Sequence, residues 1–214
     1  MGVMIVAVTD IHGNASMVKK LADELSGLDF EMILIAGDVT HFGNGVEAKK
    51  ILEPLLDLGR PVLAVMGNCD GRDVSEALEE LGISVHNRRI EINGKGVVGF
   101  GGSNITPFST VWEFTEEEIK RGLEKNYRAG DIILTHAPPH GTSLDRTVSG
   151  LHVGSQALRK FIEERRPPLV VCGHIHEGRG VDVIGETVAV NPGPLFRGYY
   201  ALIENRKVEL RRLR

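Results

Sequence analysis

The sequence of 214 residues predicts an α/β fold, and three observations lead to this expectation. Short apolar runs that suit buried strands alternate with stretches in which apolar residues recur at helical spacing. Strands that alternate with helices are typical of a largely parallel sheet. With 42% hydrophobic residues, a chain of this length can also bury one full core, so we expect a single domain over residues 1–214.

The first half of the chain reads as three units of a strand followed by a helix. The first strand is expected from Val3 to Val8, and Asn14 is placed to cap the helix behind it, where apolar residues recur at positions 17, 21 and 25. The second unit joins "MILIAGD" to a helix around residues 51–56. The third joins "PVLAVMGNCD" to a helix from about Val74 to Leu81.

The second half contains two more expected helices, after which the residue pattern changes from helical spacing to the alternation typical of strands. Thr115 and Glu118 match a capping box at the start of one helix, and a later helix ends before Pro167. From Val181 the alternating stretches "VDVIGETVAV", "YYALIEN" and "KVELRRL" predict an antiparallel meander, whose last strand we expect to be a charged edge strand. "GFGGSN" and residues 136–155 lack periodicity and are expected to be loops.

Charge and cysteine content narrow the classes of partner. A net charge of -4 argues against a general affinity for nucleic acids or for anionic membranes, which need a basic surface. Cys69 and Cys172 are too few for a disulfide framework, and no secretory signal or apolar run of membrane-spanning length is visible. We therefore expect a soluble cytoplasmic protein without a membrane partner, and a homo-oligomer stays open.

Metal-capable side chains follow the apolar runs at the points where these strands should end. In open α/β sheets the carboxyl ends of the strands form the crevice in which ligands bind, so these side chains should converge. Oxygen and nitrogen donors of this kind suit Mn, Fe, Zn, Co or Ni. The set exceeds what one ion needs: Asp10, His12, Asp38, Asn68, His136, His174 and His176.

These residues lie in five ordered motifs, "DIH", "GD", "GNCD", "TH" and "GHIH". In this order the motifs resemble the signature of the calcineurin-like metallophosphoesterases, and the resemblance extends from Val3 to about Pro194. It implies a four-layer α-β-β-α sandwich with two mixed sheets. It also implies two divalent metal ions bridged by Asp38, with manganese expected and Fe, Zn, Ni or Co as alternatives. One ion would be held by Asp10, His12 and His176, and the other by Asn68, His136 and His174.

The resemblance further implies a metal-dependent phosphoesterase that acts on a small phosphate ester. Two ions can clamp the phosphoryl oxygens and lower the pKa of a shared water, so that a metal-bridging hydroxide attacks phosphorus. Many members of the family carry His where Cys69 stands, and a thiol is a poor general acid. The departure is similar to a small prokaryotic branch active on phosphodiesters, which favours a phosphodiesterase. The alternatives are a phosphomonoesterase, a nuclease, and a non-catalytic metal-bound scaffold.

Further residues are candidates for catalysis or for substrate binding. His140, which follows His136 closely, is the first candidate for a catalytic acid and for a substrate contact, with His41 and Cys69 as further substrate-binding candidates. Asp70 is included with the catalytic candidates as a residue that orients a ligand or caps the next helix.

The same residues also have ordinary structural interpretations. Taken singly, each motif is more often a turn, a helix cap or a solvated histidine, and only the ordered set of five carries the functional prediction. For His41, His140 and His152 the ordinary interpretation is about as common as a substrate role. Arg146 and Arg179, in nearby loops, are candidates for binding phosphate.

Overall fold

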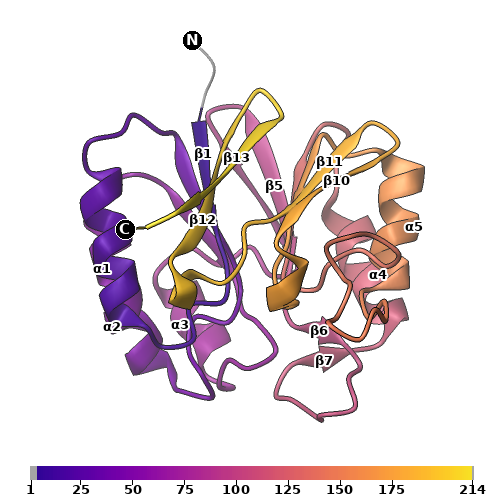
Figure 1. The fold of residues 1–214 in the computed structure, drawn as a ribbon, viewed down its shortest axis with the longest axis horizontal. Helices are drawn as coiled ribbons and strands as arrows, with labels where there is room; N and C mark the ends of the chain where they lie inside the picture. Colours follow the sequence, from indigo (N-terminus) through magenta and orange to yellow (C-terminus); the bar gives the residue numbers. More distant parts are fainter. Residues whose placement is uncertain (1–3, 214) are drawn as a thin grey trace.

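The computed structural model describes residues 4–213, in which two large sheets lie face to face (Figure 1). The five-stranded sheet has the order β13 (Lys207–Arg212), β12 (Tyr199–Glu204), β1 (Met4–Val8), β2 (Met32–Ala36) and β3 (Val62–Val65). The six-stranded sheet has the order β10 (Gly180–Ile184), β11 (Thr187–Asn191), β9 (Leu169–Val171), β8 (Ile132–Thr135), β5 (Lys95–Phe100) and β4 (Arg88–Ile92). A small third sheet pairs β6 (Ser103–Asn104) with β7 (Glu113–Phe114).

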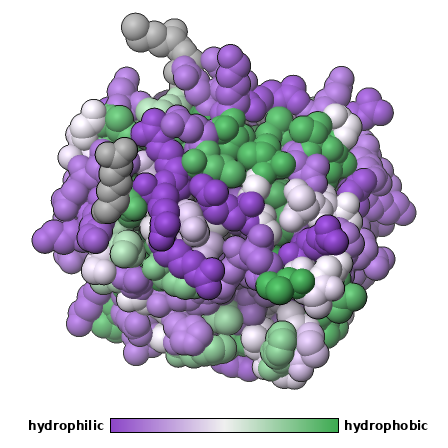
Figure 2. Space-filling model, viewed as in Figure 1, coloured by the Kyte–Doolittle hydropathy of each residue, from purple (hydrophilic) through white to green (hydrophobic). Residues whose placement is uncertain are grey.

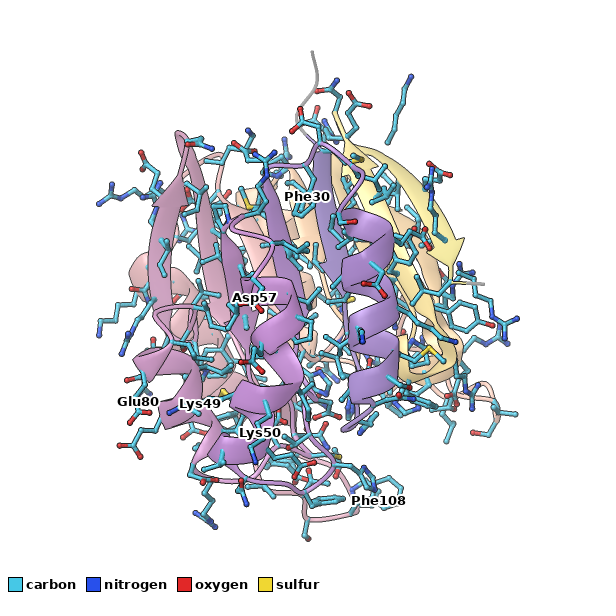
Figure 3. The ribbon with its side chains drawn as sticks, turned by 90° about the vertical axis from the view of Figure 1, so that its left-hand side faces the viewer. Phe30, Lys49, Lys50, Asp57, Glu80 and Phe108 are labelled. Carbon is cyan, nitrogen blue, oxygen red and sulfur yellow. The ribbon has the colours of Figure 1, made fainter. Side chains whose placement is uncertain are left out.

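Helices cover the outer face of each large sheet. The five-stranded sheet is covered by α1 (Ala15–Leu25), α2 (Gly45–Leu56) and α3 (Val74–Glu80), which face the viewer in Figure 3. The six-stranded sheet is covered by α4 (Glu116–Asn126) and α5 (Gln156–Arg165). An ion pair between Lys49 and Glu80 joins α2 to α3 at the surface. The expected α/β class and the four-layer sandwich are both confirmed.

The alternation of side chains along each inner strand assigns them to two different core layers. In β1, Val6 and Val8 pack against the helices, whereas Ile5 and Ala7 pack between the two sheets. Because both faces of the inner strands are buried, their sequences are continuously apolar rather than alternating. β1 and β2 are parallel, with Ile5 opposite Met32, and this pairing directs both of their carboxyl ends to the same edge of the sheet.

Most of the expected helix ends are confirmed. The Asn14 side chain accepts a hydrogen bond from the Met17 amide and so caps α1. Thr115 and Glu118 form a complete capping box at the start of α4. The first strand is described from Met4, since Val3 of the expected strand lies outside the described residues.

The predicted antiparallel meander is wrong. The four C-terminal strands form two hairpins in different sheets: β10 and β11 join the six-stranded sheet, whereas β12 and β13 join the five-stranded one. β11 also pairs with β9 in the parallel sense. Residues of the two hairpins alternate in polarity in the same way, so the pattern does not reveal which sheet each one enters. β13 is an edge strand, as expected.

The expectation that "GFGGSN" is a loop is wrong in part. Gly99 and Phe100 end β5, and Ser103 and Asn104 form β6. Between residues 136 and 155 the structure has no helix and no named strand, as expected. Among residues 4–213, no helix combines the length and the apolar character that crossing a membrane requires.

Candidate metal centre

The centre is built on the turns that follow the parallel strands, at their carboxyl ends. Asp10, His12 and Asp38 all have left-handed backbone conformations, with φ of 52°, 46° and 52°. The Asp10 amide donates to the Gly37 carbonyl oxygen at 3.1 Å, and the His12 amide donates to the Asp38 carbonyl oxygen at 2.9 Å. These bonds tie the two turns together. Left-handed residues with short polar side chains are tolerated in such turns, which aim the side chains back over the sheet edge.

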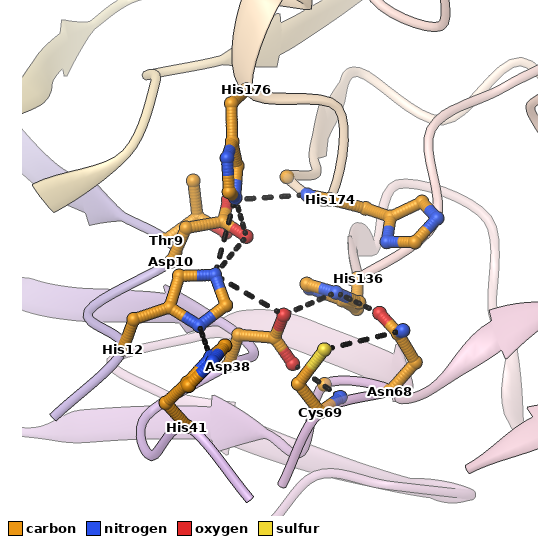
Figure 4. A network of polar contacts seen from close by, with 12 residues as sticks. Thr9, Asp10, His12, Asp38, His41, Asn68, Cys69, His136, His174 and His176 are labelled. Atoms are coloured by element: carbon orange, nitrogen blue, oxygen red, sulfur yellow. Dashed lines mark hydrogen bonds and ion pairs between the residues drawn. The ribbon is translucent and has the colours of Figure 1, made fainter. Parts of the chain in front are cut away.

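Three predicted ligands form the first cluster of donors (Figure 4). His176 Nε2 lies 3.3 Å from Asp10 Oδ1, and His12 Nε2 lies 3.7 Å from the same oxygen. The two imidazole Nε2 atoms are 3.1 Å apart. His176 begins the short 3-10 helix η1 (His176–Gly178), which follows β9 in the other sheet. The cluster therefore joins residues 164 positions apart in the sequence.

A second cluster lies beside the first and shares Asp10 with it. His136 Nε2 lies 3.4 Å from Asp38 Oδ2 and 2.9 Å from Asn68 Oδ1. Asp38 Oδ2 is also 3.6 Å from His12 Nε2, so this carboxylate lies between the two clusters. The His174 ring centroid is 5.0 Å from that of His136. All seven predicted ligands thus lie in one place, and Asp38 has the central position expected of a bridging residue.

The hydrogen bonds around His136 test whether these residues fit a metal. His136 Nδ1 lies 2.7 Å from the Ala36 carbonyl oxygen and must carry a proton to bond it. In the neutral ring the Nε2 lone pair then faces oxygens of Asn68 and Asp38. The Asn68 amide nitrogen donates to Thr110 Oγ1 at 3.0 Å, which fixes the amide oxygen toward His136. Three acceptors directed at one point require a cation between them.

Asp10 gives a second indication. Its Oδ1 is a buried carboxylate oxygen that has no hydrogen-bond partner among the described residues, although two imidazoles lie nearby. A buried charged oxygen left unpaired is costly, and a metal ion would satisfy it. The donor set of carboxylates, imidazoles and one amide oxygen suits first-row divalent ions. The residues present therefore fit a metal centre.

The pKa shifts follow from burial and from the crowding of charges. Burial would raise the pKa of the Asp38 carboxyl, but His136 and His12 outweigh this effect and hold it well below its usual range. Burial would likewise lower the pKa of His136, yet Asp38 raises it to about 9. Burial and the charge of His136 lower the pKa of His174 to about 4. Without a metal, the proton on His136 therefore takes the place of a cation.

Asp70 organises the turns and does not reach into the centre. Its carboxylate is fully buried and accepts hydrogen bonds from the Val39, Thr40 and Gly67 amides and from the Thr40 hydroxyl. These donors flank Asp38 on one side and Asn68 on the other. Burial and the nearby Asp38 raise the pKa of Asp70 to about 6. The side chain makes no cap bond to α3, whose N-cap is Asp73, so of the two expected roles the orienting one fits.

The predicted substrate-binding residues lie in different places. Cys69 is half-buried inside the centre, where its amide donates to Asp38 Oδ1 at 2.8 Å, and burial raises the pKa of its thiol. His41 Nδ1 lies 3.2 Å from His12 Nδ1. His140 lies farther out, with its Nδ1 3.5 Å from the buried carboxylate of Asp145.

The two loop arginines do not line the centre. Arg179 stacks on the Tyr199 ring and donates to the carbonyl oxygens of Pro192 and Arg211. Its guanidinium is engaged by protein groups, so the expected phosphate contact is wrong for Arg179. Arg146 is exposed and lies beside Gly150.

Two cavities border the centre, one at His12 and His176 and the other at His174. The first, of about 420 Å³, is lined by five residues, two of which belong to the first metal cluster: His12, His176, Asn14, His41 and Phe196. The second cavity has a volume of about 550 Å³. It borders the centre at His174 and Ile175, and residues from the segments 104–108 and 147–156 form most of its walls. The apolar walls of this second cavity come from loops without periodicity, and the sequence gives no signal that would have identified them.

A sequence model of the calcineurin-like phosphoesterase family matches residues 3–178 of the chain. The chain belongs to this family. An uncharacterized protein of Methanocaldococcus jannaschii is 38% identical to this phosphoesterase over 197 residues, which cover 89% of the present chain and 88% of the relative. The close sequence match does not assign a substrate.

Solved structures share the fold. A crystal structure of a Thermus thermophilus protein matches with a TM-score of 0.78 and 21% identity, covering 100% of both chains. A protein described as a novel archaeal phosphodiesterase matches with a TM-score of 0.60 and 16% identity, covering 98% of this chain and 99% of the other. At these identities the likeness shows the architecture, and the family membership supports a metal-dependent phosphoesterase.

Proposed function

We propose that this phosphoesterase is a two-metal phosphodiesterase that hydrolyses a small organic diester in the cytoplasm. The observation that carries the proposal is that two separate cavities border the metal centre, one at His12 and His176 and the other at His174. A phosphodiester has two organic arms, one on each side of its phosphorus, and each cavity offers room for one arm. A phosphomonoester would leave one of the two cavities without a function.

The charge of the cavity walls supports the same choice. No lysine or arginine lines either cavity in the described part of the chain. A phosphomonoester carries nearly two negative charges at neutral pH, whereas a diester carries one, so a diester needs less help from fixed cations. The centre itself attracts the anion, because two divalent ions outweigh the carboxylates of Asp10 and Asp38.

When bound, two divalent ions supply Lewis acidity and an activated water to the ester. The chain's own residues hold the ions and set the geometry. Asp10, His12 and His176 would hold one ion, and Asn68, His136 and His174 the other, with Asp38 shared between them. We propose manganese as the native metal, because carboxylate and amide oxygens of the kind that Asp10, Asp38 and Asn68 supply suit this ion; the four imidazoles also suit Fe, Zn or Ni, which are the alternatives.

The contact between His12 and His41 determines which nitrogen of each imidazole ring carries the hydrogen. A neutral His12 that binds metal through Nε2 carries its hydrogen on Nδ1 and donates it to Nδ1 of His41. His41 must then carry its own hydrogen on Nε2, the ring nitrogen left for a substrate. This Nε2–H can donate a hydrogen bond to an oxygen of the ester and so position the substrate. Burial raises the pKa of the Cys69 thiol, which is therefore unsuited to supply a proton to the leaving oxygen.

The test is metal removal followed by an assay of diester and monoester hydrolysis. Protein stripped with a chelator should not cleave bis(4-nitrophenyl) phosphate, and added Mn²⁺ should restore the activity. Asp38→Ala should lower kcat/KM by about a thousandfold, because removing one group that stabilises the transition state can cost that much. Asp23→Ala, on the exposed face of α1, is the matched control and should keep full activity.

Three outcomes would contradict the proposal. Activity that survives complete metal removal would exclude the two-metal mechanism. Faster turnover of 4-nitrophenyl phosphate than of the diester would indicate a phosphomonoesterase. Tight metal binding without turnover of any ester would indicate a binding scaffold.

A further inference from the structure

The larger cavity is lined by exposed apolar side chains that do not belong to the hydrophobic core of the protein. Phe108 is 81% exposed, Ile105 66% and Leu151 64%, and all three line this cavity. Phe108 lies at the lower end of the molecule in Figure 3, beyond the helices and on the side where the strands end. Large apolar side chains exposed around a cavity that adjoins a catalytic centre are typical of a ligand-binding wall.

Polar side chains in the same cavity are held in place by a buried carboxylate. Asp145 is fully buried, and its Oδ1 lies 2.7 Å from His152 Nδ1 and its Oδ2 3.5 Å from His140 Nδ1. Backbone amides of Gly141, Thr142 and Gly154 also donate to this carboxylate. The two imidazoles line the cavity with their outer edges available for hydrogen bonds.

The charges of the wall restrict the ligand to a neutral group. The one carboxylate that lines this cavity within residues 4–213 belongs to Glu116, which is already bonded by the Ser155 hydroxyl and the Gln156 and Ala157 amides. The same wall has no lysine or arginine to pair with a second phosphate. A plain alkyl chain would leave the outer nitrogens of the two imidazoles without a partner on the ligand, and unpaired polar groups are costly to desolvate.

We propose that this cavity binds a nucleoside as one arm of the phosphodiester. A nucleoside combines a flat aromatic base, which can stack on Phe108, with ring nitrogens and hydroxyls that can bond His140 and His152. The volume of about 550 Å³ is in the range of small-molecule sites. The inference rests on the proposed diesterase function, because it assigns the substrate class of that same site.

The first experiment measures binding without catalysis. Thymidine, which has no phosphate, is titrated into the wild-type protein by calorimetry with and without metal. Binding should occur in both states, and Phe108→Ala should weaken it about tenfold, since loss of one base-stacking contact typically costs that much. Val183→Ala, also exposed but outside both cavities, is the control and should bind thymidine like the wild type.

The second experiment compares two diesters with the same leaving group. Thymidine 5′-(4-nitrophenyl phosphate) and methyl 4-nitrophenyl phosphate differ in the second arm alone. In Phe108→Ala, kcat/KM should fall about tenfold for the thymidine ester, chiefly through KM, and stay within about twofold for the methyl ester. Leu151→Ala, in the wall of the same cavity, should show the same split between the two esters.

The outcomes separate this inference from the proposed function. Absence of turnover for both diesters, with thymidine still bound, would overturn the diesterase and leave a nucleoside site. If both diesters are turned over and Phe108→Ala lowers kcat/KM equally for both, or for neither, the nucleoside assignment is overturned while the diesterase stands. Absence of thymidine binding to the wild type would also overturn the assignment. Phe108 is largely exposed, so its replacement should not disturb the fold.

Discussion

The orientation of one amide side chain determines whether the second metal cluster can form. Asn68 presents its oxygen to His136 because its nitrogen donates to Thr110 Oγ1. The Thr110 hydroxyl in turn donates to Glu113 Oε1 at 2.6 Å, so it is left as an acceptor for Asn68. Hydrogen bonds from Thr106 and Thr110 outweigh burial and lower the pKa of Glu113 to about 2, which keeps this acceptor ionised. The chain from Glu113 to Asn68 is a positioning network.

We expect Thr110→Val to weaken metal binding about tenfold, since loss of a residue that orients a metal ligand commonly costs this much. Without the hydroxyl, the Asn68 amide can rotate and turn its nitrogen toward the cation. Calorimetric titration of Mn²⁺ into the stripped protein measures the effect independently of catalysis.

The matched control for this variant is Thr106→Val. Thr106 donates to the same glutamate oxygen at 2.6 Å but makes no bond to Asn68. Thr106→Val should therefore bind Mn²⁺ like the wild type, and Thr110→Ser should restore the affinity. Equal weakening in the two valine variants would show that the loop as a whole, rather than the amide, matters.

The sequence could predict which seven side chains come together at the strand ends, but not the backbone turns that bring them together. An extended chain would put Asp10 and His12 on one strand face, yet β1 ends at Val8 and both residues have positive φ. His174 has φ of 68° and lies beyond β9, so the late pair of histidines does not share a strand face either. Hydrophobic periodicity reports strands well and says nothing of the turns between them. The order of the motifs grouped these seven residues because it depends on position in the chain and not on backbone geometry.

The elements show a similar division. Strands with buried faces and helices with clear caps could be predicted, whereas the hairpin of β4 and β5 was missed. Its turn carries Asn93 and Gly94, a strong hairpin signal, with positive φ at both residues. The assignment of β12 beside β1 could not be predicted, because the pairing joins Met4 to Glu204 across nearly the whole chain. Partner choice at such separation depends on the packed core and not on local pattern.

A histidine between α3 and β4 should make stability depend on pH. His86 packs against Phe100, with ring centroids 4.9 Å apart, and its Nδ1 accepts a hydrogen bond from the Gly101 amide. Burial is the largest cause that lowers its pKa, to about 4. The unfolded chain therefore takes up a proton near pH 6.5 while the folded protein does not, and stability is lost as the pH falls from about 6.5 to about 4.

We expect His86→Gln to remove part of this loss. The full shift corresponds to about 3 kcal/mol, so between pH 7 and pH 4.5 the wild type should lose roughly 2 kcal/mol more unfolding free energy than the variant. Glutamine keeps an acceptor for the Gly101 amide without titrating. Urea unfolding of the metal-free proteins at the two pH values gives the comparison. The same loss in both proteins would show that His86 does not control the acid limb.

The two sheets meet at the metal centre as well as in the core between them. Asp10, Asp38 and Asn68 follow strands of the five-stranded sheet, whereas His136 and His174 follow strands of the six-stranded one. Apolar residues from both sheets fill the layer between them, among them Ile5, Leu34 and Val171. A bound ion would therefore connect the two halves of the molecule at the edge where the parallel strands end. The unfolded chain cannot present the same donors together.

Metal binding should for this reason stabilise the whole molecule. A ligand that binds the folded state alone adds about 2.7 kcal/mol at a concentration of 100 times its Kd. For a chain of this length each kcal/mol raises the midpoint of thermal unfolding by about 2–4 °C, so saturating Mn²⁺ should raise it by about 5–10 °C. Differential scanning calorimetry of stripped and reloaded protein measures this shift.

Asp38→Ala should lose most of the shift in the unfolding midpoint, because its carboxylate lies between both clusters, while Asp23→Ala should keep the shift. An equal rise in Asp38→Ala would mean that the stabilising ions bind elsewhere on the surface. Two separate transitions that merge when Mn²⁺ is added would instead show that the centre couples the two sheets.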